Sequence, residues 1–156
     1  MSDRYTRVTT ADASKEVLMA DRVKKVNYVY VTVPNRAGQG AKVLGELREE
    51  GVNLLAYSGF PGKGGKAQLD MIPENMTELR RVAKKKGWRL SKPKKGFLVQ
   101  GSDTVGAVHR HIDKLASKKI NITAADAVAA GKKRYGMILW VKPKDYSRAA
   151  RVLRAK

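Results

Sequence analysis

The chain has 156 residues, of which 42% are hydrophobic and 30% are charged, enough for one ordinary domain or two small ones. Lysine and arginine total 33 against 14 aspartate and glutamate, so the formal net charge is +19 and the surface is predicted to be positive. The sequence has no cysteine, which excludes disulfides, cysteine-ligated zinc, iron–sulfur clusters and thiol catalysis. The first residues are polar, and no apolar run approaches the roughly 20 residues that span a bilayer. We therefore expect a soluble cytoplasmic protein without a membrane partner.

An internal repeat divides the sequence into two parts. Gly51-Val52-Asn53-Leu54, shifted by 68 residues, falls on Lys119-Ile120-Asn121-Ile122, and the same shift places Gly38 on Gly106. Apolar positions fall on apolar positions along both copies, which is typical of a duplicated unit. The predicted organisation is an N-terminal extension over residues 1–24, a first unit over residues 25–93 and a second unit over residues 94–156.

The first unit is predicted to alternate strands and helices in a fixed order. Val29, Val31 and Val33 alternate with Tyr28 and Tyr30, which is the pattern of a half-buried strand. The predicted strands cover residues 26–33, 52–58, 67–72 and 88–90, and the predicted helices lie between residues 38 and 51 and between residues 73 and 87. This β-α-β-β-α-β order is the ferredoxin-like arrangement, an α+β fold with an antiparallel sheet and helices on one face.

The second unit repeats this order but ends one strand early. Its predicted strands cover residues 97–101, 120–128 and 135–141, and its predicted helices cover residues 105–118 and 146–153. Without a fourth strand, the first strand of the unit would keep an open edge, which proteins usually cover. Residues 4–10 have strand-forming composition, and we predict that they supply the missing strand.

The turn after the first predicted strand resembles a known family. Val33-Pro34-Asn35-Arg36-Ala37-Gly38, followed by a helix and Gly51-Val52-Asn53-Leu54, is similar to the ACT domain, a regulatory module that senses small molecules. The nearest likeness is to the serine-sensing domain of phosphoglycerate dehydrogenase, although Ala37 stands where the family pattern has proline. In the second unit, Asp103-Thr104-Val105-Gly106 keeps only part of the pattern. The resemblance implies two tandem ACT-type units.

The resemblance also implies a ligand and its binding residues. In the family, side-by-side domains pair their second strands, and the ligand lies at that junction. The residues that take these roles by resemblance are Asn35, Arg36, Ala37, Gly38 and Asn53 in the first unit and Asp103, Gly106 and Asn121 in the second. Backbone N–H groups at a helix start suit a carboxylate, and asparagine amides suit an ammonium group. The sequence therefore predicts a non-enzymatic regulatory protein for a small amino acid or similar carboxylate, acting on a partner such as a regulated enzyme.

No residues in the sequence form a recognisable catalytic or metal-binding pattern. His109 and His111 are the only histidines, and two residues apart on a helix they point about 200° apart, so they are not expected to share a metal. The glycines and lysines of residues 59–66 lack the phosphate-loop spacing and fit a hairpin turn better. We expect no enzyme activity and no cofactor.

Nucleic-acid binding is the alternative hypothesis. Residues 80–96 contain nine lysines and arginines and no acid, which indicates either a solvated basic face or a surface for RNA or another polyanion. RNA-recognition motifs share this topology and stack bases on aromatic side chains of the sheet. However, Tyr135 shares a predicted face with Met137 and Leu139, which would bury the ring that should stack.

Aromatic side chains also predict how the protein assembles. Strand alternation places one group of residues on the sheet face opposite the helices: Tyr28, Tyr30, Leu55, Tyr57 and Trp140. Such a surface is seldom left in contact with water. We expect it to pack against the other unit or a second chain, most simply in a homodimer.

Overall fold

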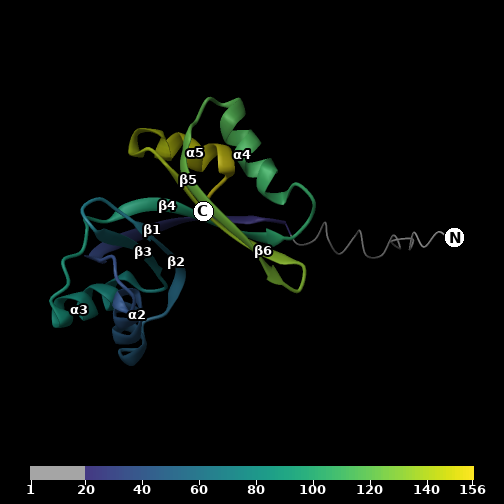
Figure 1. Cartoon of the computed structure of the whole chain (residues 1–156). Coiled ribbons are helices and arrows are strands. Elements are labelled where there is room, and N and C mark those ends of the chain that lie inside the picture. The colour runs from purple at the N-terminus through teal and green to yellow at the C-terminus, as the bar shows by residue number, and fades with distance from the viewer. Residues whose placement is uncertain (1–19) are drawn as a thin grey trace, which may run out of the picture. The chain divides into compact units, whose positions relative to one another are not determined.

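The computed structural model describes residues 20–156, and within them the chain forms two compact units (Figure 1). One unit is Val26–Gly96. The other comprises Phe97–Lys156 and the described residues that precede Val26. No helix among the described residues is both long and apolar enough to cross a membrane.

The unit Val26–Gly96 is a three-stranded antiparallel sheet with two helices on one face. Its elements are β1 (Arg22–Pro34, which begins before the unit), α2 (Gln39–Glu49), β2 (Leu54–Pro61), β3 (Lys66–Pro73) and α3 (Met76–Lys86). The strands lie in the order β2-β3-β1, and β3 pairs antiparallel with both neighbours. The buried core joins alternate strand residues to both helices and consists of Val29, Val31, Leu69 and Met71 with Val43, Leu47, Leu79 and Val82. The helices are thus packed on the strand face predicted from the alternation.

The segment after α3 lies beside β1 without forming a regular strand. The sequence predicts a short strand over residues 88–90, but the structure assigns none there. The backbone N–H of Ser91 donates to the carbonyl of Tyr30 at 2.9 Å, and the Ser91 hydroxyl accepts from the Tyr30 N–H at 2.9 Å. Because a side chain takes the place of one backbone partner, the ladder is broken, although the segment occupies the position of a fourth strand.

The other unit repeats the same plan. Its elements are β4 (Lys94–Ser102), α4 (Ala107–Ser117), β5 (Ile122–Gly131), β6 (Arg134–Val141), the short 3-10 helix η1 (Pro143–Asp145) and α5 (Tyr146–Leu153). The strands lie in the order β4-β6-β5, again antiparallel. Tyr135, Met137 and Leu139 are buried in one core with residues of α4 and α5, so the predicted burial of Tyr135 is confirmed.

Within the described residues no strand follows α5 in the second unit, and the start of β1 belongs to this unit. Val23 belongs to its core cluster. Lys156 donates its backbone N–H to the carbonyl of Val23 at 3.0 Å, and its carbonyl accepts from the N–H of Lys25 at 2.8 Å. The strand predicted over residues 4–10 lies outside the described residues.

Candidate functional site

The turn predicted to bind a ligand connects β1 to the start of α2. Gly38 precedes the helix in the left-handed conformation, with φ of 90°, which glycine adopts far more readily than other residues. No side chain among residues 20–156 caps the N-terminus of α2. Asn35 and Arg36 are exposed, and the Asn35 N–H donates to the carbonyl of Gly65 at 2.9 Å. The turn therefore presents an uncapped helix start beside one amide and one guanidinium group.

An open cavity of about 290 Å³ adjoins this turn. Asn35, Arg36 and Gln39 line it together with residues of β2, among them Tyr57 and Phe60. The two aromatic side chains are 40% and 43% exposed, so their rings are partly open to solvent. A cavity of this size suits a small molecule with one apolar side.

Tyr57 does not lie on the sheet face opposite the helices, so the prediction for this residue is wrong. It lies directly across from Met71, a core residue, so both side chains are on the helix face. A Cβ added at Gly40, in the first turn of α2, would lie 3.3 Å from the Tyr57 hydroxyl oxygen. The pairing of β2 with β3 shifts between Leu54 and Ala56, and such a bulge reverses the alternation that follows it. Burial raises the pKa of Tyr57, so its hydroxyl stays protonated and can donate.

Asn53 lies at the opposite end of the sheet from Asn35. It immediately precedes β2, whose first residue, Leu54, pairs with Pro73, whereas Pro34 of β1 pairs with Lys66. The side-chain amide of Asn53 donates to a Glu74 carboxylate oxygen at 3.3 Å. The backbone carbonyl of Asn53 accepts from the backbone N–H of Glu74 at 2.9 Å. The full length of β3 therefore separates the two asparagines within one unit, and no ligand the size of an amino acid could contact both there.

The second unit places its predicted residues in the same way. Asp103 and Gly106 line a cavity of about 230 Å³ between β4 and α4, together with Val128 and Tyr135. Gly106 precedes α4 with φ of 78°, which matches Gly38. Asn121 precedes Ile122, which pairs with Val141 at the far end of β6. Asn121 and Asp103 are thus separated like the two asparagines of the first unit.

A polar cluster that the sequence did not predict lies in the second unit. Asp21 accepts hydrogen bonds from the Tyr135 hydroxyl at 2.7 Å and from Arg110 at 3.1 Å, and its carboxylate lies 2.6 Å from Nε2 of His111. Burial raises the pKa of Asp21, but the hydrogen bonds from Tyr135, His111 and Arg110 outweigh burial, so its pKa lies below the usual 3.8. His111 is 4% exposed. Because Asp21 and His111 are 90 residues apart, no local pattern could have indicated the cluster.

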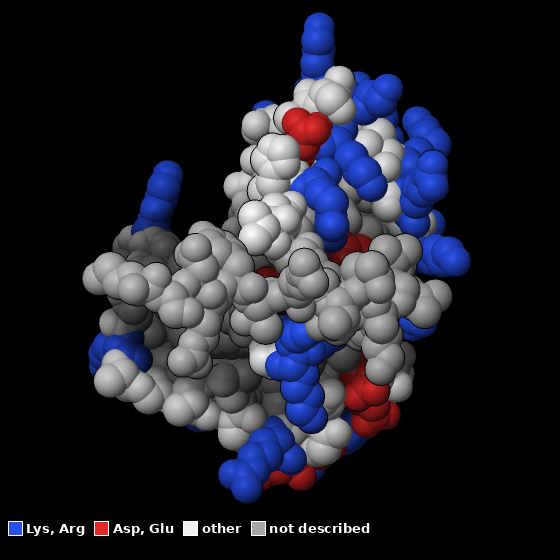
Figure 2. Space-filling view, turned by 90° about the vertical axis from the view of Figure 1, so that its right-hand side faces the viewer, with Lys and Arg blue, Asp and Glu red and all other residues white. Residues whose placement is uncertain are grey.

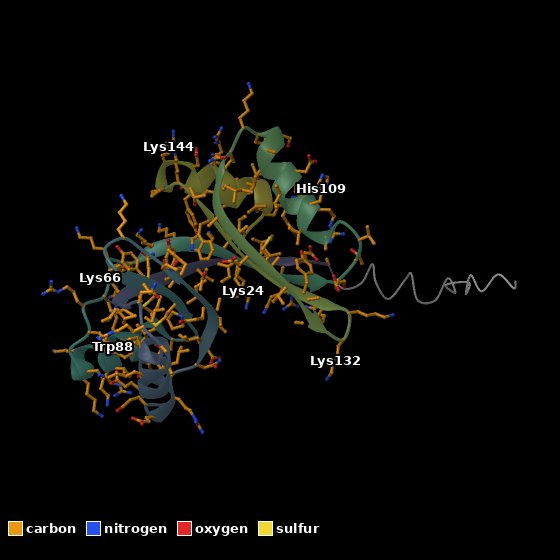
Figure 3. All side chains as sticks on the ribbon, viewed as in Figure 1. Lys24, Lys66, Trp88, His109, Lys132 and Lys144 are labelled. Carbon is orange, nitrogen blue, oxygen red and sulfur yellow. The ribbon has the colours of Figure 1, made fainter. Side chains whose placement is uncertain are left out.

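The two histidines do not meet, as predicted. His109 is exposed on α4 (Figure 3), whereas His111 points into the core. Among residues 20–156, no group of three or more histidine, aspartate or glutamate side chains could hold a metal ion.

Similarity to known proteins is found among solved structures and not at the level of sequence. No family model and no curated protein match the sequence. A protein from Bacteroides thetaiotaomicron has a TM-score of 0.72 at 14% identity, over 85% of this chain and 88% of that one. The ligand-free regulatory subunit of aspartate kinase from Thermus thermophilus has a TM-score of 0.58 at 15% identity, over 87% and 94%. That of Thermus flavus has a TM-score of 0.53 at 20% identity, over 87% and 94%.

At these identities, the likenesses show the fold alone. They extend over nearly the whole of this chain and of the similar structures. The fold predicted from the sequence, two ferredoxin-like units in one chain, is thereby confirmed.

Proposed function

We propose that the protein is a non-enzymatic regulatory protein that binds a small amino acid, or a similar carboxylate, at the junction between paired units of two copies. The observation that carries this proposal is the placement of β2. This strand is an edge of its sheet, with the Asn35 turn at one end and Asn53 at the other.

Pairing of two β2 strands would bring the separated asparagines together. Two identical edge strands related by a two-fold axis run antiparallel, so the start of one lies beside the end of the other. Asn53 of one copy would then approach Asn35 and Arg36 of the second copy. The exposed β2 residues Leu55 and Phe60 would be covered in the same step. A homodimer therefore completes a site that one unit cannot form.

The groups at this junction suit a zwitterion. The uncapped start of α2 and the Arg36 guanidinium favour a carboxylate, because the helix start carries partial positive charge and the guanidinium is a cation. The amide oxygens of Asn35 and Asn53 can accept from an ammonium group. The sequence of the turn, Asn35-Arg36-Ala37-Gly38, resembles that of the serine-sensing domain of phosphoglycerate dehydrogenase, and this resemblance supports a small amino acid. The second unit has no arginine in the matching turn, so we propose the principal site on β2, with Asp103, Gly106 and Asn121 forming a secondary one.

The name of the Thermus structures, regulatory subunits of aspartate kinase, supports a role in which ligand binding acts on a partner enzyme. We propose that this protein likewise transmits binding to an enzyme through the surface or the pairing of its units.

Binding measurements on asparagine variants test the site. Asn35→Ala and Asn53→Ala should each weaken amino-acid binding by about 1–3 kcal/mol, because each leaves a buried polar group of the ligand without its partner. Asn27→Ala is the matched control, since Asn27 is also exposed but lies at the start of the unit, away from the turn. Calorimetry that gives the same affinity for all three variants would contradict the site.

A mixture of the two variants tests the pairing. In a dimer of one Asn35→Ala chain with one Asn53→Ala chain, one of the two sites keeps both wild-type asparagines. The mixture, after exchange of subunits, should therefore recover binding that neither variant shows alone. A mixture that binds no better than its components would rule out a site shared by two copies.

A further inference from the structure

Positive charge is concentrated at the end of the unit Val26–Gly96. Residues 80–96 hold nine lysines and arginines and no acid. Figure 2 shows another part of the surface, where lysine and arginine side chains are also more prominent than aspartate and glutamate. Some of these basic residues form ion pairs with carboxylates of the protein, and others do not.

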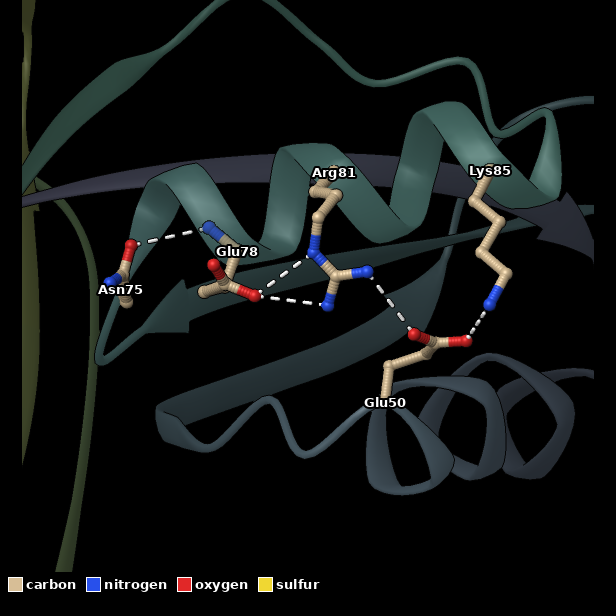
Figure 4. A network of polar contacts seen from close by, with 5 residues as sticks. All are labelled: Glu50, Asn75, Glu78, Arg81 and Lys85. Atoms are coloured by element: carbon tan, nitrogen blue, oxygen red, sulfur yellow. Dashed lines mark hydrogen bonds and ion pairs between the residues drawn. The ribbon is translucent and has the colours of Figure 1, made fainter.

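One flank of α3 has its charge engaged within the unit. Arg81 contacts the carboxylates of Glu78 at 3.0 Å and Glu50 at 3.2 Å, and Lys85 also contacts Glu50 (Figure 4). The hydrogen bonds from Lys85 and Arg81 lower the pKa of Glu50, so this carboxylate stays ionised. These two cations are therefore already balanced by anions.

The other flank of α3 carries cations that are not balanced in this way. Arg80 and Lys84 are one helical turn apart, about 100° around the axis from Arg81 and Lys85. Both are exposed, and neither forms an ion pair with any residue of the described part of the chain. Lys86, the last residue of α3, is also exposed, as are Arg89 and Lys92 in the segment after the helix. We call Arg80, Lys84, Lys86, Arg89 and Lys92 the basic flank.

The basic flank offers charge without apolar surface. Leu79, Val82 and Ala83 of α3 are at most 3% exposed, and Met76 packs partly buried against the core of the unit. The helix therefore has no apolar face that could enter a membrane. Among the described residues, none of the exposed large apolar side chains belongs to residues 80–96. Protein interfaces need such an apolar centre, whereas contacts to a phosphate backbone do not.

The aromatic residues beside the basic flank are occupied. Lys94 covers the ring of Tyr30, with its amino nitrogen 5.3 Å from the ring centre. The Trp88 indole packs against the core and donates to Glu46 at 2.8 Å. Binding of single strands relies on open aromatic rings on which bases stack. A surface of cations alone instead fits the regular phosphates of a duplex.

We propose that the basic flank binds the phosphate backbone of duplex nucleic acid without reading its sequence. This surface lies on α3 and the segment after it, and is distinct from the amino-acid site at β2. Its contacts are lysine and arginine to phosphate, so affinity falls steeply with salt.

Two double variants of the full-length protein with the same net charge locate the surface. Fluorescence anisotropy with a labelled duplex, over a series of salt concentrations, measures affinity and its salt dependence. Arg80→Gln with Lys84→Gln should weaken binding and lower the slope of log affinity against log salt by about 2, or about 1 for each lost phosphate contact. Arg81→Gln with Lys85→Gln removes the same charge but should leave the slope unchanged within about 0.5. Thermal melting of each variant checks that it is folded, and Arg89→Gln with Lys92→Gln repeats the test off the helix.

Three results would overturn the proposal. Equal losses in the two α3 variants would mean that the total charge, not this flank, causes binding. Tighter binding of a single strand than of the duplex would contradict the backbone geometry. Tighter binding of heparin than of the duplex would make the partner another polyanion.

Discussion

At the scale of single residues, the Asp21 carboxylate occupies the space that a side chain at Gly101 would need. A Cβ at Gly101 would overlap a carboxylate oxygen of Asp21. The absence of a side chain at Gly101 lets the carboxylate approach β4 and receive donors from α4 and β6. Asp21 thereby attaches the start of β1 to the second unit.

Gly101→Ala should be among the most destabilising substitutions in the chain. The added methyl group must displace the Asp21 carboxylate from Tyr135 and Arg110, so we expect a loss of about 2–4 kcal/mol in the free energy of unfolding. Denaturant titration measures it. Gly45→Ala is the control, because a Cβ there meets nothing within 4 Å and the residue lies inside a helix. A loss at Gly101 no larger than the change at Gly45 would show that Asp21 does not need this space.

The lowered pKa of Asp21 predicts a pH dependence. A carboxyl group whose pKa is lower in the folded protein contributes stability above its unfolded pKa of 3.8 and loses it as the pH falls through the folded value. Asp21→Asn should therefore reduce stability by about 1–3 kcal/mol at pH 7, and the difference from wild type should shrink below about pH 4. Melting curves of both proteins across this range test it, and a constant difference would be inconsistent with an ionised Asp21.

At the scale of elements, the β5–β6 hairpin has an unusual turn. Lys132 and Lys133 form its two-residue loop with φ of 50° and 55°. Positive φ at both positions defines a type I′ turn, which normally contains Asn-Gly because other residues pay a steric cost of about 1–2 kcal/mol each. The chain thus keeps two lysines where the backbone would favour asparagine and glycine.

Replacing the loop should stabilise the protein. Lys132→Asn with Lys133→Gly removes the steric cost, and we expect the free energy of unfolding to rise by about 1–2 kcal/mol. Lys114→Gly inside α4 with Lys118→Asn at its C-cap, a change of the same composition, should instead destabilise it, because glycine is unfavourable in a helix. A hairpin variant no more stable than wild type in denaturant titration would show that the turn carries no strain.

The elements also show how far sequence reasoning reaches. Alternation and helical spacing are local, so they predict the order of strands and helices in both units and the burial of Tyr135. The β2 bulge depends on pairing with β3, and for that reason Tyr57 was assigned to the wrong face. Asp21 and His111 meet only through the fold. The turn at Asn35 is visible in the sequence, but its distance from Asn53 is not.

At the scale of the whole molecule, the protein combines two ferredoxin-like units with a net charge of +19. The fold is shared with regulatory subunits of aspartate kinase, whereas the charge is a property of this sequence. The proposed ligand site and the basic flank lie on separate elements of the unit Val26–Gly96, namely the edge strand β2 for the site and α3 with the segment after it for the flank. Loss of one function should therefore leave the other intact.

The most direct test of the central claim is a calorimetric titration of the common amino acids into the wild-type protein and its Asn35→Ala variant. We expect at least one small amino acid to bind wild type with a saturable heat, and the variant to bind it at least about tenfold more weakly, equivalent to 1.4 kcal/mol. If none of the amino acids binds wild type, or if the variant binds as tightly as wild type, the claim is contradicted.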